Sequence, residues 1–579
     1  MTIPTPTSSP FDEGLLNQLA GALFAALPGQ QPVGVQAPAN PLPAGATFGP
    51  FGNGPQLPGT LVPGGNAAPT SPQDIASLAA AQPARVPKSP AGNGVPDALY
   101  TALPALDSRL GGAALGVSSP SSEGLPFYFL DFPHPGANAS QAVPHARPFY
   151  LGEHATLAAP AEASPRHDTS AHPPFDVHAI RRDFPILSEH VNGRPLAWFD
   201  NAATTHKPRA VIERISHFYE HENSNIHRAA HELAARATDA YEGARKTVAR
   251  FIGASGVDEI VFVRGTTEAI NLVANTWGEK HIGAGDEIIV SHLEHHANIV
   301  PWQMLAARKG AKLRVIPVDD SGQVLLEEFK RLLNDNTKLV AVTQVSNALG
   351  TVVPVKAIVE IARRAGATTL VDGAQSVSHM RVDVHALDTD FFVFSGHKIF
   401  GPTGIGVVYG KRSVLEDLPP WQGGGNMIQD VTFEKTVYHA PPTRFEAGTG
   451  NIADAVGLGA ALEYVERIGI ENIGRYEHDL LAYATPLLRE IRGVRLIGTA
   501  VDKASVLSFV LDGYSTDEVG QALNQEGIAV RTGHHCAQPI LRRFGLETTV
   551  RPSLAFYNTC DEVDRMIAVV QRLSGQRRH

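Results

Sequence analysis

Short apolar runs alternate with amphipathic segments from residue 175 to about residue 455. The runs predict buried strands, and the segments between them repeat their apolar residues with a helical period. Strands that alternate with helices build a mostly parallel sheet with helices on both faces, so the pattern predicts an α/β fold. The strands are expected at Arg194–Phe199, Glu259–Val263, Asp286–Val290, Leu313–Pro317, Leu339–Thr343, Thr369–Val371 and Phe391–Phe394.

The last stretch of the chain, residues 455–579, has a different pattern. It mixes helical segments with strands such as Ser505–Leu511. This mixture predicts a smaller α+β domain. We therefore expect a large domain over residues 176–454 and a small C-terminal domain over residues 455–579.

Residues 1–175 differ from both in composition. They contain 29 of the 43 prolines and only 15 of the 106 charged side chains. A segment rich in Pro, Gly, Ala and Ser, with few bulky apolar residues, cannot bury enough surface to offset the entropy lost on ordering. The composition predicts a long disordered arm.

Three apolar islands interrupt this arm. Ser9–Leu27 and Ser71–Ala81 each open on a Ser-Pro pair and resemble short helices. Leu125–Pro133 is rich in aromatic residues, a pattern echoed by Arg147–Leu151. Such islands are typical of peptide segments that order on a partner. The alternative is that they fold back onto the globular part.

The bulk composition excludes several classes of function. The net charge of −10 and the pI near 6.2 argue against a nucleic-acid or anionic-membrane partner. Cys536 and Cys560 are the only cysteines, which excludes a disulfide framework and a multi-cysteine metal site. No apolar run reaches the about 20 residues that span a bilayer. The first basic residue is Arg85, so the start of the chain lacks the positive region of a secretory signal. We expect a soluble, cytoplasmic protein.

One lysine stands just beyond a predicted buried strand. Phe391–Phe394 leads into Ser395-Gly396-His397-Lys398, with a second glycine-rich turn directly behind. In α/β proteins, ligands bind at the carboxyl ends of strands. A partly desolvated lysine at that position can lose its proton and form a Schiff base with an aldehyde cofactor. The alternative is a surface lysine after an edge strand.

Two other strand ends carry groups that suit such a cofactor. Arg264-Gly265-Thr266-Thr267-Glu268 places two hydroxyls at a helix N-terminus, which either binds phosphate or only caps the helix. Asp372 follows the strand Thr369–Val371, and a buried carboxylate needs a cationic partner such as a protonated pyridine nitrogen. Gln375 could then reach a phenolic oxygen. A structural Asp N-cap is the competing interpretation.

Two adjacent histidines, His295 and His296, favour stacking over metal binding. The order His292-Leu293-Glu294-His295-His296 does not match the zinc-binding H-E-x-x-H pattern. Neighbouring side chains project about 100° apart on a helix, so both imidazoles cannot face one metal. One imidazole stacked on a flat cofactor ring fits better, and we expect no metal site.

A cysteine lies in a loop rich in glycine and histidine, Arg531-Thr532-Gly533-His534-His535-Cys536. Neighbouring imidazoles and Arg531 favour the thiolate, which is the nucleophilic form. Arg551 could pair bidentately with a carboxylate. Cys560 stands at a helix start and is expected to be structural.

Taken in order, these motifs resemble those of the SUF-type cysteine desulfurases, the second group of that family. The resemblance implies the type I fold of pyridoxal phosphate enzymes and conversion of L-cysteine to L-alanine with a persulfide on Cys536. It runs from about Phe175 to the C-terminus and rests on Asn201-Ala202-Ala203-Thr204, Arg264-Gly265-Thr266-Thr267-Glu268, Glu294-His295-His296-Ala297-Asn298, Asp372-Gly373-Ala374-Gln375, Ser395-Gly396-His397-Lys398, Arg444-Phe445-Glu446-Ala447-Gly448-Thr449 and Arg531-Thr532-Gly533-His534-His535-Cys536.

The resemblance implies a role for each matching position. Lys398 would hold pyridoxal 5'-phosphate and move the Cα proton, Cys536 would attack the substrate sulfur, and His296 would stack on the cofactor ring. The other cofactor contacts would be Asp372, Gln375, Thr266, Thr267, Ser395, His397 and, from the second subunit of a homodimer, Thr449. The substrate contacts would be Arg551, Asn347, His227 and Arg531.

The arm is not typical of SUF-type enzymes. It is similar to the N-terminal extension of desulfurases packaged as cargo in encapsulin shells, above all in Leu125–Pro133. This similarity implies a shell protein as partner and a location inside a cytoplasmic nanocompartment. The alternatives to the cysteine desulfurase activity are selenocysteine lyase activity and a vestigial role in assembly. The sulfur acceptor, for example a SufE-like protein, is left open.

Overall fold

The structure is a computed structural model that describes residues 175–227 and 231–576. The predicted arm, with its apolar islands, lies outside the described residues apart from its last residue, Phe175. Among the described residues, no helix is long and apolar enough to cross a membrane.

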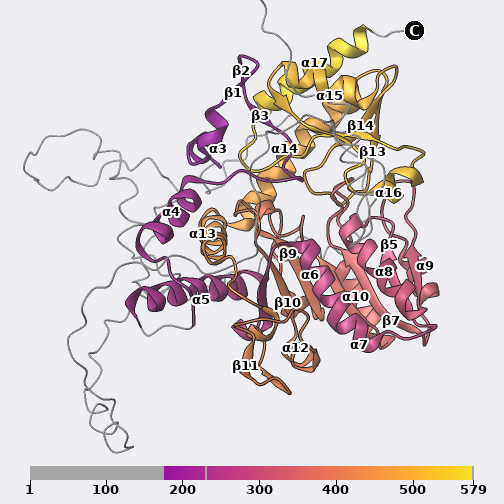
Figure 1. Cartoon of the computed structure of the whole chain (residues 1–579). Helices are drawn as coiled ribbons and strands as arrows, with labels where there is room; N and C mark the ends of the chain where they lie inside the picture. The colour runs from indigo at the N-terminus through magenta and orange to yellow at the C-terminus, as the bar shows by residue number, and fades with distance from the viewer. Residues whose placement is uncertain (1–174, 228–230, 577–579) are drawn as a thin grey trace, which may run out of the picture. The chain divides into compact units, whose positions relative to one another are not determined.

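A seven-stranded sheet forms the centre of the large domain (Figure 1). Its strand order is β4-β10-β9-β8-β7-β5-β6, and only β10 runs antiparallel to its neighbours. The predicted mostly parallel sheet is thus confirmed. The strands are β4 (Ile260–Val263), β5 (Glu287–Ser291), β6 (Lys312–Ile316), β7 (Thr337–Thr343), β8 (Thr368–Asp372), β9 (Phe391–Ser395) and β10 (Gly406–Gly410).

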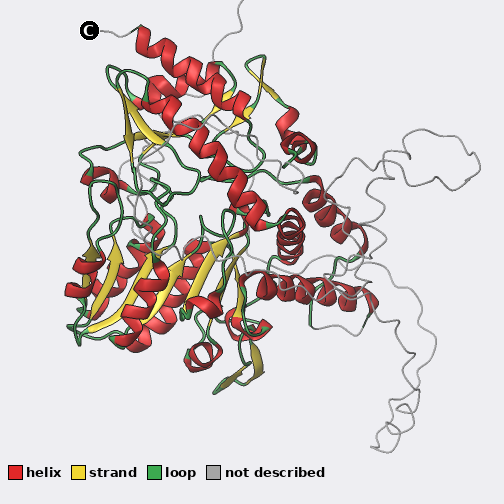
Figure 2. Cartoon of the chain, turned by 180° about the vertical axis from the view of Figure 1, so that it is seen from behind, coloured by secondary structure: helices red, strands yellow, loops and turns green. Residues whose placement is uncertain are grey.

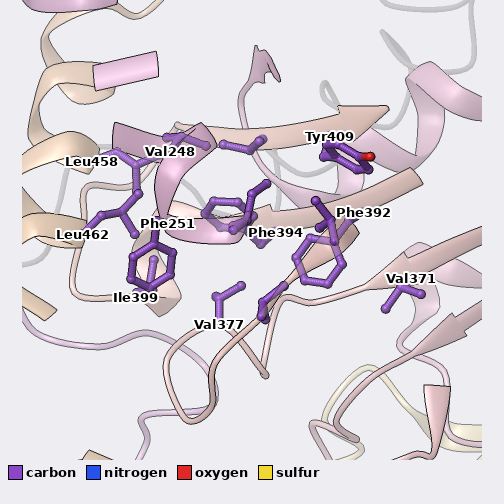
Figure 3. Close-up of a cluster of buried hydrophobic side chains, with 14 of the residues drawn as sticks. Val248, Phe251, Val371, Val377, Phe392, Phe394, Ile399, Tyr409, Leu458 and Leu462 are labelled. Atoms are coloured by element: carbon purple, nitrogen blue, oxygen red, sulfur yellow. The ribbon is translucent and has the colours of Figure 1, made fainter. Parts of the chain in front are cut away.

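Helices cover both faces of this sheet (Figure 2). Strand β9 is apolar at successive positions because its side chains enter two cores. Phe392 and Phe394 pack with α5 and α13, as Figure 3 shows, whereas Phe391 and Val393 pack on the opposite face. The first face is covered by α5 (Glu232–Ile252), α10 (Val355–Arg364) and α13 (Ile452–Ile468), and the second by α6 (Thr266–Val273), α8 (Val300–Lys309) and α12 (Arg412–Asp417).

The C-terminal part contains a four-stranded antiparallel sheet of order β13-β14-β17-β16. Two of its helices, α15 and α17, begin with capping boxes, Ser515 with Glu518 and Thr559 with Glu562, which satisfy free N–H groups of the first turn. The elements are β13 (Val494–Ile497), β14 (Ser508–Leu511), β16 (Arg531–Gly533), β17 (Thr549–Arg551), α14 (Ile470–Arg489), α15 (Thr516–Gln525), α16 (Gln538–Arg543) and α17 (Cys560–Gly575).

Chain segments cross between the two parts. Helix α13, which follows residue 451, packs against α4 and α5. Strand β3 pairs in parallel with β15, so residues 197–198 join the C-terminal part. The remaining elements are α3 (Val177–Arg181), α4 (Arg209–His221), α7 (Glu279–His281), α9 (Leu326–Leu332), α11 (Val384–Leu387), β1 (His190–Val191), β2 (Arg194–Pro195), β3 (Ala197–Trp198), β15 (Ile528–Ala529) and the hairpin β11 (Ile428–Val431) and β12 (Thr436–Tyr438).

Candidate active site

Lys398 lies in a single 3-10 turn at the carboxyl end of β9. The carbonyl oxygen of His397 accepts three hydrogen bonds, from the amide of Thr205 at 3.0 Å, from Thr204 Oγ1 at 3.0 Å and from Thr205 Oγ1 at 3.2 Å. Gly396 must be glycine because a Cβ there would lie 2.8 Å from Ile405 Cγ2. The turn is therefore fixed at the edge of the sheet where α/β proteins bind ligands.

The amine of Lys398 is tuned by its surroundings. Burial lowers its pKa to about 8, Asp372 and Cys536 act in the opposite direction, and Arg551 acts in the same direction. A useful fraction of the amine is consequently unprotonated near neutral pH, and the free amine is the form that attacks an aldehyde. Strands β8 and β9 are neighbours in the sheet, with Asp372 opposite Val393, so their carboxyl ends bring Asp372 and Lys398 to the same edge.

Asp372 is the last residue of β8, and Gln375 follows it at the same edge of the sheet. Asp372 is buried, its Oδ1 accepts a hydrogen bond from the amide of Ala374 at 2.9 Å, and burial raises its pKa. Lys398 is the one cationic side chain of the described residues that lowers its pKa, so a further cation supplied by a ligand would stabilise it. Gln375 is also buried and donates to the carbonyl of Ala202 at 2.7 Å.

The N-terminus of α6 meets the end of β9. The amide of Thr266 donates to Ser395 Oγ at 2.9 Å, and the two hydroxyls lie 2.8 Å apart. Thr267 is exposed at the next position. Burial lowers the pKa of His397 to about 4, and the charge of Lys398 adds to the effect. These groups offer hydroxyl and N–H donors, together with the helix dipole, to a phosphate.

The two adjacent histidines have different surroundings. Burial lowers the pKa of His295 to about 3, and the charges of Lys398, His296 and Arg551 lower it further, so this imidazole is within electrostatic reach of the lysine and arginine of the site. His296 instead stacks on His534, with ring centroids 5.9 Å apart. His295 Nδ1 accepts a hydrogen bond from the amide of Ala297 at 3.0 Å, so the proton of the neutral ring is on Nε2.

Two arginines share one carboxylate. Asp200 Oδ1 accepts from Arg551 Nη2 at 3.0 Å, and Oδ2 accepts from Arg531 Nε at 3.0 Å. Arg551 is buried, and its Nη1 donates to the carbonyl of Asn347 at 3.1 Å. Within the described part of the chain, Arg551 Nε and Asn347 Oδ1 are buried without a hydrogen-bond partner. A cationic pocket with unused polar atoms suits a small carboxylate.

Cys536 is exposed in a tight turn that touches the histidine loop. The amide of His296 donates to the carbonyl of Cys536 at 2.8 Å. The amide of Cys536 itself donates to His534 Nδ1 at 3.0 Å. Cys560, in contrast, is the first residue of α17, and burial raises the pKa of its thiol.

Two predicted site residues, His227 and Thr449, do not contact this group. Thr449 is exposed, and its Oγ1 lies 3.3 Å from Oδ1 of Asn225, two residues before His227. His227 Nε2 lies 3.2 Å from Glu242 Oε1. The segment before Thr449 is held by Glu446, which forms a buried ion pair with Arg245 at 2.7 Å. These residues thus gather on a second surface.

Two buried carboxylates of the site were not predicted, Asp200 and Glu294. Glu294 accepts hydrogen bonds from Ser291 Oγ at 2.5 Å, from Asn298 Nδ2 at 2.7 Å and from the amide of Thr343 at 3.0 Å. Burial raises its pKa to about 7. Asp200 stands two residues beyond β3 and Glu294 three residues beyond β5, and a carboxylate close behind a strand was the available signal.

Four histidines, one buried and three partly buried, predict acid sensitivity. Burial lowers the pKa of His295 and His535 to about 3 and that of His206 and His397 to about 4. Their unfolded pKa is about 6.5, so the unfolded chain binds more protons below that pH. Above about pH 6.5 these imidazoles are neutral in the folded and the unfolded chain, so they do not lower the free energy of unfolding. Below that pH, the free energy of unfolding falls by up to about 1.4 kcal/mol for each histidine and each pH unit.

We therefore expect the urea midpoint of the cofactor-free protein to drop steeply between about pH 6.5 and about pH 5. His535→Asn, which does not titrate, should show a shallower drop. A midpoint that stays constant over this range would contradict the neutral state of the four imidazoles.

Comparisons with known proteins agree with this geometry. Residues 197–566 match the model of the aminotransferase class-V family. A cysteine desulfurase of Synechococcus elongatus is 63% identical over 461 residues, which cover 80% of this chain and 73% of that protein. A cysteine desulfurase of Pectobacterium carotovorum is 50% identical over 400 residues, 69% of this chain and 98% of that protein. The apo structure of a cysteine desulfurase from Thermococcus onnurineus has a TM-score of 0.66 at 40% identity and covers 70% of this chain and 99% of that one.

Proposed function

Because this chain belongs to the aminotransferase class-V family and is a pyridoxal phosphate-dependent cysteine desulfurase, we propose that Lys398 holds the cofactor and that Cys536 receives the sulfur of L-cysteine. The observation that carries this assignment is geometric: β8 and β9 pair beside each other and end at Asp372 and just before Lys398, and the turn of Cys536 is hydrogen-bonded to His296 and Asn347. The products are L-alanine and a persulfide on Cys536.

The residues at the strand ends fit the cofactor. When bound, pyridoxal phosphate supplies an electron sink for the substrate's Cα. Asp372 would pair with the pyridine nitrogen, since this buried carboxylate interacts with only one cationic side chain of the described residues, Lys398. Gln375 would face the phenolic oxygen. The phosphate would be held by Thr266, Thr267, Ser395 and His397.

We revise the prediction for the stacking histidine from His296 to His295. Burial, and then Lys398 and Arg551, lower the pKa of His295, which supports a position of its ring near these two residues. The hydrogen bond from Ala297 to Nδ1 fixes the orientation of that ring. His296 then supports the cysteine turn through its backbone amide and its contact with His534.

The substrate is held by its carboxylate. Arg551 and Asn347 have buried polar atoms without partners, and Arg531 adds positive charge at the exposed side. Lys398 would hold the cofactor, and its amine, when free, would be the base that removes the Cα proton, because its lowered pKa lies near neutral pH. Cys536 then accepts the sulfur. The same residues would accept selenocysteine, so selenocysteine lyase activity is the second candidate.

The separate surface of His227 and Thr449 supports a homodimer. Among the described residues, the side-chain polar partners of His227 and Thr449 are Glu242 and Asn225, not the residues around Lys398, and the buried Arg245–Glu446 pair fixes the segment that presents Thr449. We assign Thr449 and His227 to the site of the second subunit. In a SUF-type enzyme, the exposed turn of Cys536 would hand its sulfur to an acceptor such as a SufE-like protein.

We assign to the N-terminal arm the role of bringing the enzyme into a protein shell. The match to the Synechococcus elongatus relative spans 461 residues, more than the stretch from residue 175 to residue 579, so it extends into the arm. The Pectobacterium carotovorum relative is covered to 98% by only 69% of this chain and leaves the arm unmatched. The arm would dock the enzyme inside an encapsulin shell, with Leu125–Pro133 as the main contact.

Deleting residues 1–174 tests both assignments. We expect alanine release from L-cysteine to stay within about twofold, because Phe175, whose ring stacks on Tyr476 at 4.5 Å, is retained. Co-purification with a co-expressed encapsulin shell should be lost. The matched variant replaces Phe127, Tyr128 and Phe129 by alanine in the full chain. It should also keep alanine release and lose co-purification with the shell. Packaging of the shortened chain would refute the role of the arm, and lack of alanine release from both chains would refute the activity.

A further inference from the structure

The turn that carries Cys536 has an uncommon backbone conformation. His535 and Cys536 both have a φ of 54°, and the amide of Ala537 donates to the carbonyl of His534 at 2.9 Å. Positive φ at both central positions defines a type I′ turn, in which Asn and Gly are strongly preferred. Histidine and cysteine rarely adopt this conformation, so neighbouring residues must hold the turn in place.

Two residues of the large domain hold the turn by its carbonyl groups. Asn347 Nδ2 donates to the carbonyl of His535 at 2.7 Å, and the amide of His296 donates to the carbonyl of Cys536 at 2.8 Å. Asn347 is buried, so water cannot readily replace its hydrogen bond. Because Asn347 donates this hydrogen bond from its side chain, a substitution at position 347 can remove the bond.

Asn347 also faces the arginine pocket. Its carbonyl accepts from Arg551 Nη1 at 3.1 Å, and its side-chain Oδ1 is buried without a partner in the described structure. One residue therefore contacts both the proposed carboxylate site and the turn of the nucleophile. We propose that Asn347 is a positioning residue that keeps the His535–Cys536 turn in its left-handed conformation and so aims Cys536 at the substrate.

This inference rests on the proposed role of Cys536 as sulfur acceptor, but its first test does not require turnover. In cofactor-free protein, iodoacetamide alkylates the two exposed cysteines, and Cys560 on α17 serves as the internal reference. We expect Asn347→Ala to raise the alkylation rate of Cys536 relative to Cys560 by about fivefold, as one lost hydrogen bond would, because the turn relaxes. Asn347→Asp, which keeps the volume but cannot donate to His535, should act in the same way.

A compensating substitution separates positioning from substrate binding. Asparagine adopts positive φ readily, so His535→Asn should reduce the need for the hold of Asn347. In the cofactor-loaded enzyme at saturating L-cysteine, Asn347→Ala should slow sulfur arrival on Cys536 at least about tenfold in a single turnover. Adding His535→Asn should restore several-fold of that rate and return the alkylation ratio toward the wild-type value.

Two results would overturn the inference. One is an alkylation ratio that stays at the wild-type value in both Asn347 variants. The other is a loss confined to the affinity for L-cysteine, with an unchanged single-turnover rate and no recovery by His535→Asn. Absence of desulfurase turnover in every form would refute the proposed function, whereas the alkylation ratio would still decide whether Asn347 holds the turn.

Discussion

Lys398→Ala should abolish the long-wavelength absorbance of the lysine-bound cofactor and lower alanine formation from L-cysteine by at least about 10³-fold. Lys398 is both the attachment point and the base, and burial lowers its pKa to about 8. Activity should be lost because, among the described residues, no other lysine interacts with Asp372. An absorbance spectrum of the purified protein and an alanine assay measure the two effects.

Lys503 provides a matched control for that substitution. Burial lowers its pKa to about 7, and its Nζ donates to the carbonyl of Gly498 at 2.6 Å, in the C-terminal part. Lys503→Ala should therefore keep the cofactor absorbance. A protein that keeps the band without Lys398 and loses it without Lys503 would show that the cofactor is attached at a different place.

Cys536→Ser should lower the release of alanine by at least about 10²-fold and leave the cofactor absorbance unchanged. A hydroxyl cannot replace a thiolate as the nucleophile toward sulfur, whereas the cofactor contacts lie on other elements. Cys560→Ser is the matched control, since Cys560 starts α17 and has no place in the site. Undiminished alanine formation by Cys536→Ser would remove this residue from the reaction.

Those parts of the fold that depend on local pattern could be predicted from the sequence. The strand before Lys398 is apolar throughout because both faces of β9 are buried, and the strand before Asp372 follows the same rule. Parallel strands end at one edge, so two strand ends sufficed to place the lysine and the carboxylate together. Strand β10 escaped prediction because glycines at both of its ends resemble a loop.

The remaining features of the site depend on tertiary structure. His295 and His296 are neighbours in sequence. Their side chains point in different directions because the backbone of His295 is extended, with a ψ of 150°. Asp200 meets Arg531 and Arg551 across more than 300 residues, which no local pattern indicates. The left-handed turn at His535 and Cys536 contradicts residue preference and exists because distant residues hold it.

The most direct test of the central claim is the mass of the Cys536 peptide after the cofactor-loaded enzyme meets L-cysteine without an acceptor. We predict one alanine released per subunit, and a Cys536 peptide that is heavier by one sulfur atom while the Cys560 peptide keeps its mass. Alanine released with no sulfur on Cys536, or with the sulfur on Cys560, would contradict the assignment of Lys398 and Cys536 to one shared site.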